Sequence, residues 1–294
     1  MALETNLVSY WKMDETSGTR SDSKGSNDLT ASGVDYDTGQ FNNAADFNDL
    51  SDYLTIADGS QSGLDGSLDF SFSLWVNWRG VSSSGDNQFI AKHSSPFHST
   101  SPNYDLAARL TSGRLILSST MTGGSTASLT GGFWTFSTDT WHHIVVTRAN
   151  SGNLTLYLNN VLYFQTASGG GTSHDSDRPF YIGNRYNPTP SEGADALIDE
   201  VGFWSRELTT DEVEELHNSG SGLQFDNEKP GEFDDIPPIC WNYTAQYKGS
   251  TKMFKMSGPG DFPKRISIPG NIDTSTGKMI DDGQEIDPSN YEVE

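Results

Sequence analysis

Nine residues decide the fold: Phe70-Ser71-Phe72-Ser73-Leu74-Trp75-Val76-Asn77-Trp78. An apolar side chain occupies every second position, so these side chains share one face of a β-strand, because successive residues point to opposite faces. The opposite face carries two serines, Asn77 and the indole of Trp75. The stretch therefore predicts a half-buried strand with one aromatic ring on its polar side.

Similar short runs recur along the chain as far as residue 204. Leu154, Leu156 and Leu158 alternate with polar positions, and further runs lie at 53–56, 105–110, 114–118, 142–147, 161–166, 180–183 and 197–204. The Gly, Ser, Asn and Asp residues between them are typical of tight turns. Many short strands at this spacing predict an all-β protein, an antiparallel sandwich of two sheets.

One helix is predicted near residues 210–218. Thr209 or Thr210 serves as its N-cap, and acidic residues follow in the first turn, where they favour the helix dipole. Val213 and Leu216 lie three apart on one face, and Gly220 is expected to end the helix. We expect a short surface helix that closes the sandwich at about residue 225.

The composition changes after residue 225. Residues 226–238 are acidic and proline-rich and are predicted to form a linker. Residues 239–294 are predicted to hold two strands, 240–247 and 252–256, but the segment is too short and polar to form a core of its own. We therefore expect an extended C-terminal arm that becomes ordered mainly against a partner or against the sandwich.

The net charge is −22, from 18 Lys and Arg against 40 Asp and Glu. This excess opposes binding to nucleic acid or to anionic membranes, which both need clustered basic residues. No apolar run is long enough to cross a membrane. Cys240 is the single cysteine, so an intrachain disulfide is excluded. Residues 1–6 lack the basic and apolar parts of a secretory leader, so we expect folding in a cytoplasm.

Five motifs in order resemble the laminin G-like domains of the concanavalin A-like lectin/glucanase superfamily. They cover residues 7–18 with 22–25, 52–56, 70–76, 141–147 and 197–208, and the resemblance extends over about residues 5–225. The resemblance implies a jelly-roll sandwich, commonly with a structural Ca²⁺, and a role in glycan or protein adhesion.

The same resemblance implies a calcium site between an early turn and the late Asp-Glu strand. The matching residues here are Asp22, Asn27 and Asp199, together with backbone oxygens. Oxygen-only ligation of this kind suits Ca²⁺. The alternative is that Asp199 accepts hydrogen bonds from the early turn and that no ion is bound.

Four side chains are candidates for glycan binding because each opposes the apolar residues of its strand. They are Trp75, Arg109, Tyr157 and Tyr181, which would line a groove if their strands share the concave sheet. The alternative is that Trp75 and Tyr157 pack beneath a covering loop. Loop aromatic residues are further possible contacts, namely Phe97, Tyr104, Phe133, Trp134 and Tyr186.

Catalysis is not expected. Asp199 and Glu200 are adjacent, so alternation places their carboxylates on opposite faces, whereas glycosidases of this fold hold an acid and a nucleophile on one face. His142 and His143 form a strand pair that fits a structural motif of the family. We expect a protein that binds and does not react.

These features together favour a bacteriophage-type virion surface protein: a capsid decoration, fibre or tail-associated adhesin. Its sandwich would bind a glycan or cell-surface polysaccharide. Its C-terminal arm would anchor it to virion proteins or to sister subunits, with a homo-oligomer as a possible assembly. The alternative is a secreted or cell-surface bacterial carbohydrate-binding module, and a glycosidase is the third hypothesis.

Overall fold

The computed structural model describes two compact units, Met1–Asn227 and Glu228–Glu294. The residues it describes are 3–65, 69–80, 86–92, 106–111, 114–119, 127–130, 137–149, 153–167, 178–185, 188, 193–225, 244–248, 251–258, 261–267, 271–272, 279–281 and 284–285. The predicted linker at 226–238 lies outside these residues, and so do the loop aromatics Phe97, Tyr104, Phe133, Trp134 and Tyr186.

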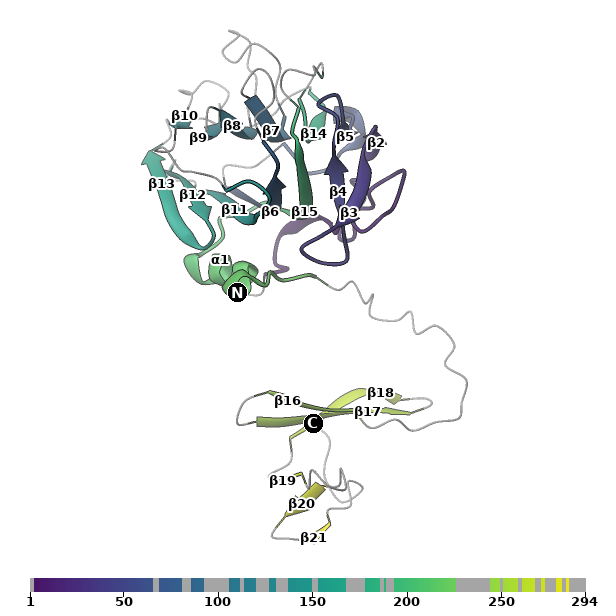
Figure 1. Ribbon diagram of the computed structural model, residues 1–294. Coiled ribbons are helices and arrows are strands. Elements are labelled where there is room, and N and C mark those ends of the chain that lie inside the picture. The colour runs from purple at the N-terminus through teal and green to yellow at the C-terminus, as the bar shows by residue number, and fades with distance from the viewer. Residues whose placement is uncertain are drawn as a thin grey trace. The chain divides into compact units, whose positions relative to one another are not determined.

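The first unit is a sandwich of two antiparallel sheets (Figure 1), as the alternation predicts. Sheet I has the order β13 (Val161–Ala167), β12 (Asn153–Leu158), β11 (Trp141–Arg148), β6 (Phe70–Trp78), β15 (Ala196–Trp204), β4 (Asn43–Phe47) and β3 (Asp35–Thr38), and β1 (Leu7–Trp11) pairs with β15. Sheet II has the order β10 (Ala127–Thr130), β9 (Arg114–Ser119), β8 (Leu106–Thr111), β7 (Asp86–Ala91), β14 (Phe180–Ile182), β5 (Tyr53–Ile56) and β2 (Thr30–Ser32).

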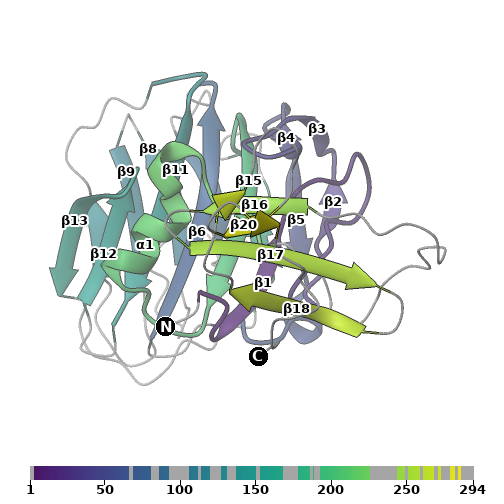
Figure 2. The same ribbon diagram turned by 90° about the horizontal axis from the view of Figure 1, so that it is seen from below.

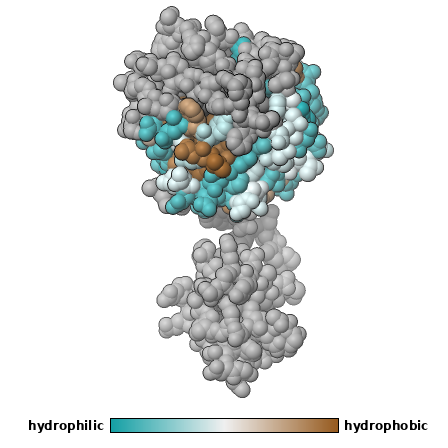
Figure 3. Space-filling view, turned by 60° about the vertical axis from the view of Figure 1, so that its left-hand side comes forward, coloured by the Kyte–Doolittle hydropathy of each residue, from teal (hydrophilic) through white to brown (hydrophobic). Residues whose placement is uncertain are grey.

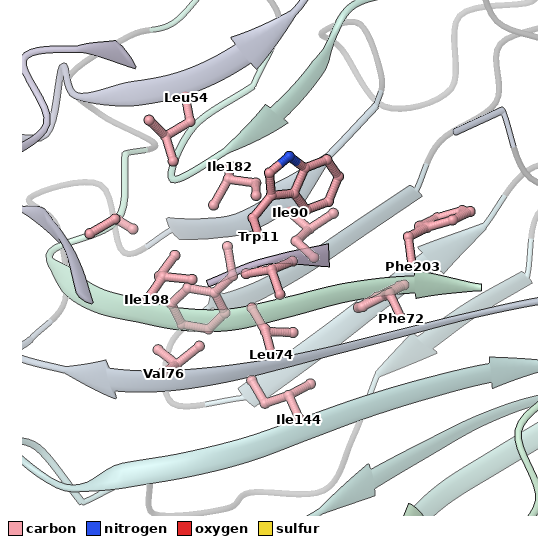
Figure 4. Close-up of a cluster of buried hydrophobic side chains, with 14 of the residues drawn as sticks. Trp11, Leu54, Phe72, Leu74, Val76, Ile90, Ile144, Ile182, Ile198 and Phe203 are labelled. Atoms are coloured by element: carbon pink, nitrogen blue, oxygen red, sulfur yellow. The ribbon is translucent and has the colours of Figure 1, made fainter. Parts of the chain in front are cut away.

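The core lies between the two sheets (Figure 4), and β6 shows how the sequence builds it. Its apolar residues point inward as predicted, and they meet inward side chains of β11 and β15 in sheet I and of β5, β7 and β14 in sheet II. Large members of this cluster are Trp11, Leu54, Phe72, Leu74, Val76, Ile90, Ile144, Ile182, Ile198 and Phe203. Burial of these groups is the main source of the stability of the sandwich.

Helix α1 (Thr210–His217) lies on the outer face of sheet I (Figure 2). Thr209 is its N-cap and forms a capping box with Glu212, whose carboxylate also accepts two hydrogen bonds from Arg206. The helix ends at Asn218 in the left-handed conformation, earlier than the predicted stop at Gly220, and the short 3₁₀ turn η2 (Asn218–Gly220) follows. A second 3₁₀ turn, η1 (Asp58–Ser60), follows β5.

The second unit contains two small antiparallel sheets. One has the order β16 (Thr244–Lys248), β17 (Thr251–Gly258) and β18 (Asp261–Ser267), and the other β19 (Asn271–Ile272), β20 (Met279–Asp281) and β21 (Gln284–Glu285). The two strands predicted here correspond to β16 and β17. The anchoring role predicted for this arm stays a prediction. In the described ranges, no helix is long and apolar enough to span a membrane.

Candidate functional site

A second apolar cluster covers the outer face of sheet I. It joins the N-terminal segment, α1 and the residues that follow α1 to side chains of β1, β11 and β15, namely Leu3, Leu7, Tyr10, Val145, Trp204, Leu208, Val213 and Leu216. Phe225 closes it with edge-on contacts to Tyr10 and Trp204, at centroid distances of 4.8 and 6.3 Å. The outer face of sheet I is therefore largely interior surface.

Trp75 belongs to this covered face and is only 3% exposed. Its indole stacks with His143 of β11 at 4.8 Å and with His217 of α1 at 5.8 Å. Gly222 passes close above it, since a Cβ there would lie 3.2 Å from the indole Nε1. The indole has no open face for a sugar in this arrangement. Trp75 instead packs beneath a covering segment, which was the alternative to glycan binding.

Ser73 and His143 form a hydrogen-bonded pair beneath the same cover, with 2.8 Å between Oγ and Nε2. Burial, together with the neighbouring His217, lowers the pKa of His143 to about 3, so the ring is neutral at ordinary pH. In the described part of the chain, its Nδ1 has no hydrogen-bond partner. A serine–histidine nucleophile needs access and a third group that orients the ring, and neither is present among these residues.

The four predicted glycan-binding residues are divided between the two sheets. Trp75 and Tyr157 belong to sheet I, through β6 and β12, whereas Arg109 and Tyr181 belong to sheet II, through β8 and β14. The four residues would line one groove only if their strands belonged to one sheet, and they do not. Tyr157 is half-buried against the apolar cluster under α1. The side chain of Arg109 lies outside the described structure.

The outer face of sheet II has a different character. Tyr181 pairs with Thr55 of β5 in the strand register, and its ring packs edge-on against Tyr53 at a centroid distance of 5.5 Å. Tyr181 is 7% exposed, and Tyr53 is more open. Thr55 donates its hydroxyl proton to the carbonyl of Phe180 at 2.9 Å. Tyr181 was predicted as a contact residue and Tyr53 was not, although Tyr53 alternates with Leu54 and Ile56 in the same way.

β13 carries exposed apolar side chains. Val161 is 59% exposed, Leu162 55% and Phe164 39%. The strand forms one edge of sheet I, and Figure 3 shows apolar surface gathered on this side of the sandwich. Exposed apolar residues on an edge strand are a surface at which chains tend to associate.

Asp22 does not fit the predicted calcium site. Its Oδ1 accepts hydrogen bonds from the backbone N–H groups of Tyr10, Lys24 and Gly25 at 2.9–3.0 Å. Its Oδ2 accepts the N–H of Asn27 at 3.0 Å. These four donors already satisfy the carboxylate and would face any cation placed beside it. Asp22 fixes the early turn onto β1.

Asn27 is likewise engaged inside the protein. Its amide donates to the Ser9 hydroxyl and to the Ser62 carbonyl, and its Oδ1 accepts the Ser62 N–H at 2.7 Å. The structure brings Asn27 and Asp22 together, but none of these partners contacts Asp199. Asp199 is held instead by the turn between β3 and β4. It accepts the N–H of Phe41 at 3.1 Å and that of Glu200 at 2.9 Å.

Asp199 is a buried carboxylate in an oxygen-rich corner. A Cβ placed on Gly39 would lie 2.3 Å from the carbonyl oxygen of Phe41, and 2.6 Å from both the carbonyl oxygen of Asn43 and Asp199 Oδ2. Burial, and to a smaller extent the charge of Asp14, raises the pKa of Asp199 to about 8, although the N–H groups of Phe41 and Glu200 act in the opposite direction. Converging oxygens around an unfavourably buried carboxylate are a donor set that fits Ca²⁺.

Backbone carbonyls are essential to any such site. No group of three or more His, Cys, Asp or Glu side chains is placed to hold a metal ion in the part of the chain that the structure describes. Asp199 was predicted from the sequence, but the turn of residues 39–43 was not. The signal was local, because Gly39 and the Asn42-Asn43 pair mark a tight turn.

Glu200 corrects the prediction that two adjacent carboxylates point to opposite faces. The register between β15 and β6 shifts between Asp199 and Gly202, and Glu200 has a φ of 50°. This β-bulge breaks the alternation, because it inserts one residue that has no counterpart on the partner strand. Glu200 accepts a hydrogen bond from Gln224 at 2.6 Å, so it reaches the segment that covers sheet I.

Comparison with known proteins gives a family match over more than half of the chain. The family model described as the concanavalin A-like lectin/glucanases superfamily matches residues 48–214, which confirms the resemblance drawn from the motifs. A search of curated proteins found no match.

Solved structures share the fold at low sequence identity. Domain 4 of AbnA, a GH43 extracellular arabinanase from Geobacillus stearothermophilus solved with arabinotriose, has a TM-score of 0.53 and 21% identity, with 74% of this chain and 98% of that chain covered. The binding domain of Paraclostridial Mosquitocidal Protein 1 has a TM-score of 0.57 and 15% identity, over 99% and 73%. A Trypanosoma rangeli sialidase has a TM-score of 0.54 and 15% identity, over 75% of this chain but 34% of that chain. At these identities the likeness concerns the fold.

Proposed function

This chain belongs to the concanavalin A-like lectin/glucanase superfamily, and on that premise we propose that its sandwich binds a glycan without catalysing a reaction on it. The observation that carries the proposal is the contrast between the two outer faces. Sheet I is covered by α1 and an apolar cluster, whereas on sheet II Tyr53 is partly exposed and packs against the buried ring of Tyr181. Aromatic rings beside polar side chains suit a sugar, which has both apolar faces and hydroxyl groups.

The surroundings of the carboxylates and of the serine–histidine pair support a non-catalytic role. Asp199 and Glu200 are both buried and accept hydrogen bonds from the protein itself. Ser73 and His143 lie beneath α1. None of these groups is placed where a substrate would reach it. Incubation with the glycans that bind should therefore release no sugar.

Calcium is the cofactor we propose, at a corner that differs from the predicted one. Asp199 and the carbonyls of Phe41 and Asn43 would hold it, and Asp22 and Asn27 would not. When bound, the ion would supply the positive charge that a carboxylate buried there lacks. Asp199 would thereby fasten the β3–β4 turn to β15, and this role is structural.

The second unit is proposed as the anchor of a virion surface protein of bacteriophage type. The division of the chain at Asn227 supports this arrangement, because it separates a sandwich of lectin type from a smaller unit of short strands. Its partners would be virion proteins or sister subunits. A full-length protein that stays monomeric, with residues 228–294 digested rapidly even beside shell proteins, would contradict the anchoring role.

A bacterial extracellular carbohydrate-binding module is the second candidate. The likeness to Domain 4 of the extracellular arabinanase favours it, since that domain was solved with arabinotriose. Genes beside the coding sequence separate the two hypotheses: capsid genes favour the virion protein, and polysaccharide-degrading enzymes favour the module.

A glycan array probed with full-length protein, in the presence of Ca²⁺ and then of EDTA, tests the binding function itself. We expect binding to a restricted set of glycans. A protein that binds no glycan in either buffer would refute the proposed function.

A further inference from the structure

The two edges of sheet I differ in charge. Among the described strands, β13 forms one edge of this sheet and β3 forms the other. In β3, Asp35 and Asp37 lie on either side of Tyr36, and all four residues of the strand are exposed. β13 has the sequence Val-Leu-Tyr-Phe-Gln-Thr-Ala, without a charged residue. Charged side chains on an edge strand oppose its pairing with another chain, so β3 is protected against such pairing and β13 is not.

Apolar side chains are exposed on both faces of β13. Leu162 is 55% exposed and pairs with Tyr157, which lies on the outer face of sheet I. Phe164 is 39% exposed and pairs with Leu156, which lies in the core. Directly paired residues share a face, so the β-bulge between these two pairs places Leu162 and Phe164 on opposite faces. A partner on one face of the sheet would cover one of them, whereas a strand added at the edge would cover both.

The surroundings of this edge are uncharged as well. Residues 115–138 and 149–174 contain no Asp, Glu, Lys or Arg, although these types make up 20% of the chain. The first stretch includes β10, which is an edge strand of sheet II, and the second includes β12 and β13. β10 lies beside β13, so strands from both uncharged stretches occupy one side of the sandwich (Figure 1).

The charge of the whole chain indicates which partner suits this side. Two copies, each with a net charge of −22, repel one another where their acidic surfaces face each other. That repulsion is smallest where the uncharged sides meet. A basic partner, in contrast, would be attracted to the acidic surface elsewhere on the chain. An uncharged, apolar edge on a strongly acidic protein therefore fits a second copy of the same chain.

We propose that β13 pairs antiparallel with β13 of a second copy about a twofold axis, so that sheet I continues from one sandwich into the other. Every residue that β13 meets in such a pairing is uncharged. Backbone N–H and C=O groups on the outer side of the strand form the new ladder, and Leu162 and Phe164 are covered on their two faces. A twofold contact uses this edge in both copies, so the assembly stops at two. The inference does not depend on glycan binding.

The test compares Leu162→Glu with Tyr36→Glu in the full-length protein. Each change places an acidic side chain on an edge strand of sheet I, at a residue that is 55% or 48% exposed, so both variants should fold. Analytical ultracentrifugation at micromolar concentrations gives the dimerisation constants. We expect the native protein and Tyr36→Glu to dimerise alike. Leu162→Glu should dimerise roughly tenfold more weakly or less, because a charge on the edge strand opposes pairing.

A native protein that stays monomeric at these concentrations would overturn the inference, and so would an assembly larger than two. Equal dimerisation in Leu162→Glu would place the contact in another part of the chain and would overturn it as well. If Leu162→Glu does not fold, hydrogen exchange of the native protein at low and high concentration decides. Slower exchange in β13 at high concentration, with β3 unchanged, supports the interface, and unchanged exchange in β13 overturns it.

Discussion

The outer faces of the two sheets differ in how far other parts of the chain cover them. On sheet I, Ser71 accepts the N–H of Leu208 and donates to the carbonyl of Arg206, and Ser73 bonds to His143. Both serines therefore have partners in the segment or strand beside them. On sheet II, Tyr53 is partly exposed beside Tyr181. One face is therefore fastened to a cover by hydrogen bonds as well as by apolar contacts, whereas the other keeps one aromatic ring partly open.

Trp75 lies beneath the cover of sheet I, so its replacement should have the largest effect on stability if this face is structural and does not bind the ligand. Trp75→Ala should lower the free energy of unfolding by about 3–5 kcal/mol, because it empties the stack beneath His217. Urea denaturation measures this loss. Affinity for the glycan, corrected for the folded fraction, should not change. A stable Trp75→Ala protein that has lost glycan binding would show that the covered face is the ligand site.

The buried carboxyl group of Asp199 should make the stability of the sandwich depend on pH. Its pKa in the folded protein is about 8, above the ordinary 3.8, so the unfolded chain releases this proton first as the pH rises. Stability from this group is therefore complete below about pH 4 and is lost progressively toward pH 8. In EDTA, the melting temperature should fall between pH 5 and pH 8, and Asp199→Asn should lessen that fall.

Calcium should reverse the loss. At a hundred times its dissociation constant, the ion adds about 2.7 kcal/mol to the stability of the native protein. Differential scanning calorimetry at pH 8 should show this gain, and it should be smaller at pH 5, where protonated Asp199 competes with the ion. Equal gains in the native protein and in Asp199→Asn would place any calcium elsewhere.

Thr209 tests the cover itself with a smaller change. Thr209→Ala removes the N-cap of α1 and half of its capping box, which should lower the free energy of unfolding by about 1 kcal/mol. Hydrogen exchange should quicken in α1 and in the strands under it, while glycan affinity stays the same. A loss of affinity here would mean that α1 contributes to the binding site.

Alternation is a local property, so it predicted strands such as β6 and β12, but it gave no sign of β2, β3, β4, β7 or β10. β6 has the predicted bounds, and its apolar residues face the core as expected. Alternation distinguishes two faces of a strand but does not say which sheet the strand joins. That depends on long-range pairing, which separates Trp75 and Tyr157 from Arg109 and Tyr181. Nor does alternation reveal that a distant helix covers the polar face of β6.

Asp199 shows a second limit. The motif identified the carboxylate, but its partners come from the turn at residues 39–43, far away in sequence. The β-bulge at Glu200 also interrupts the regular period on which the facing of the two carboxylates was predicted.

Glycan titration of two matched tyrosine variants tests the central claim most directly. Tyr53→Ala removes the more open ring of the pair on sheet II, and Tyr157→Ala removes a half-buried ring on the outer face of sheet I. With the strongest glycan from the array, Tyr53→Ala should bind about tenfold more weakly, a loss on the order of 1.4 kcal/mol. Tyr157→Ala should bind like the native protein. Binding kept in Tyr53→Ala and lost in Tyr157→Ala would contradict the assignment of the ligand to sheet II.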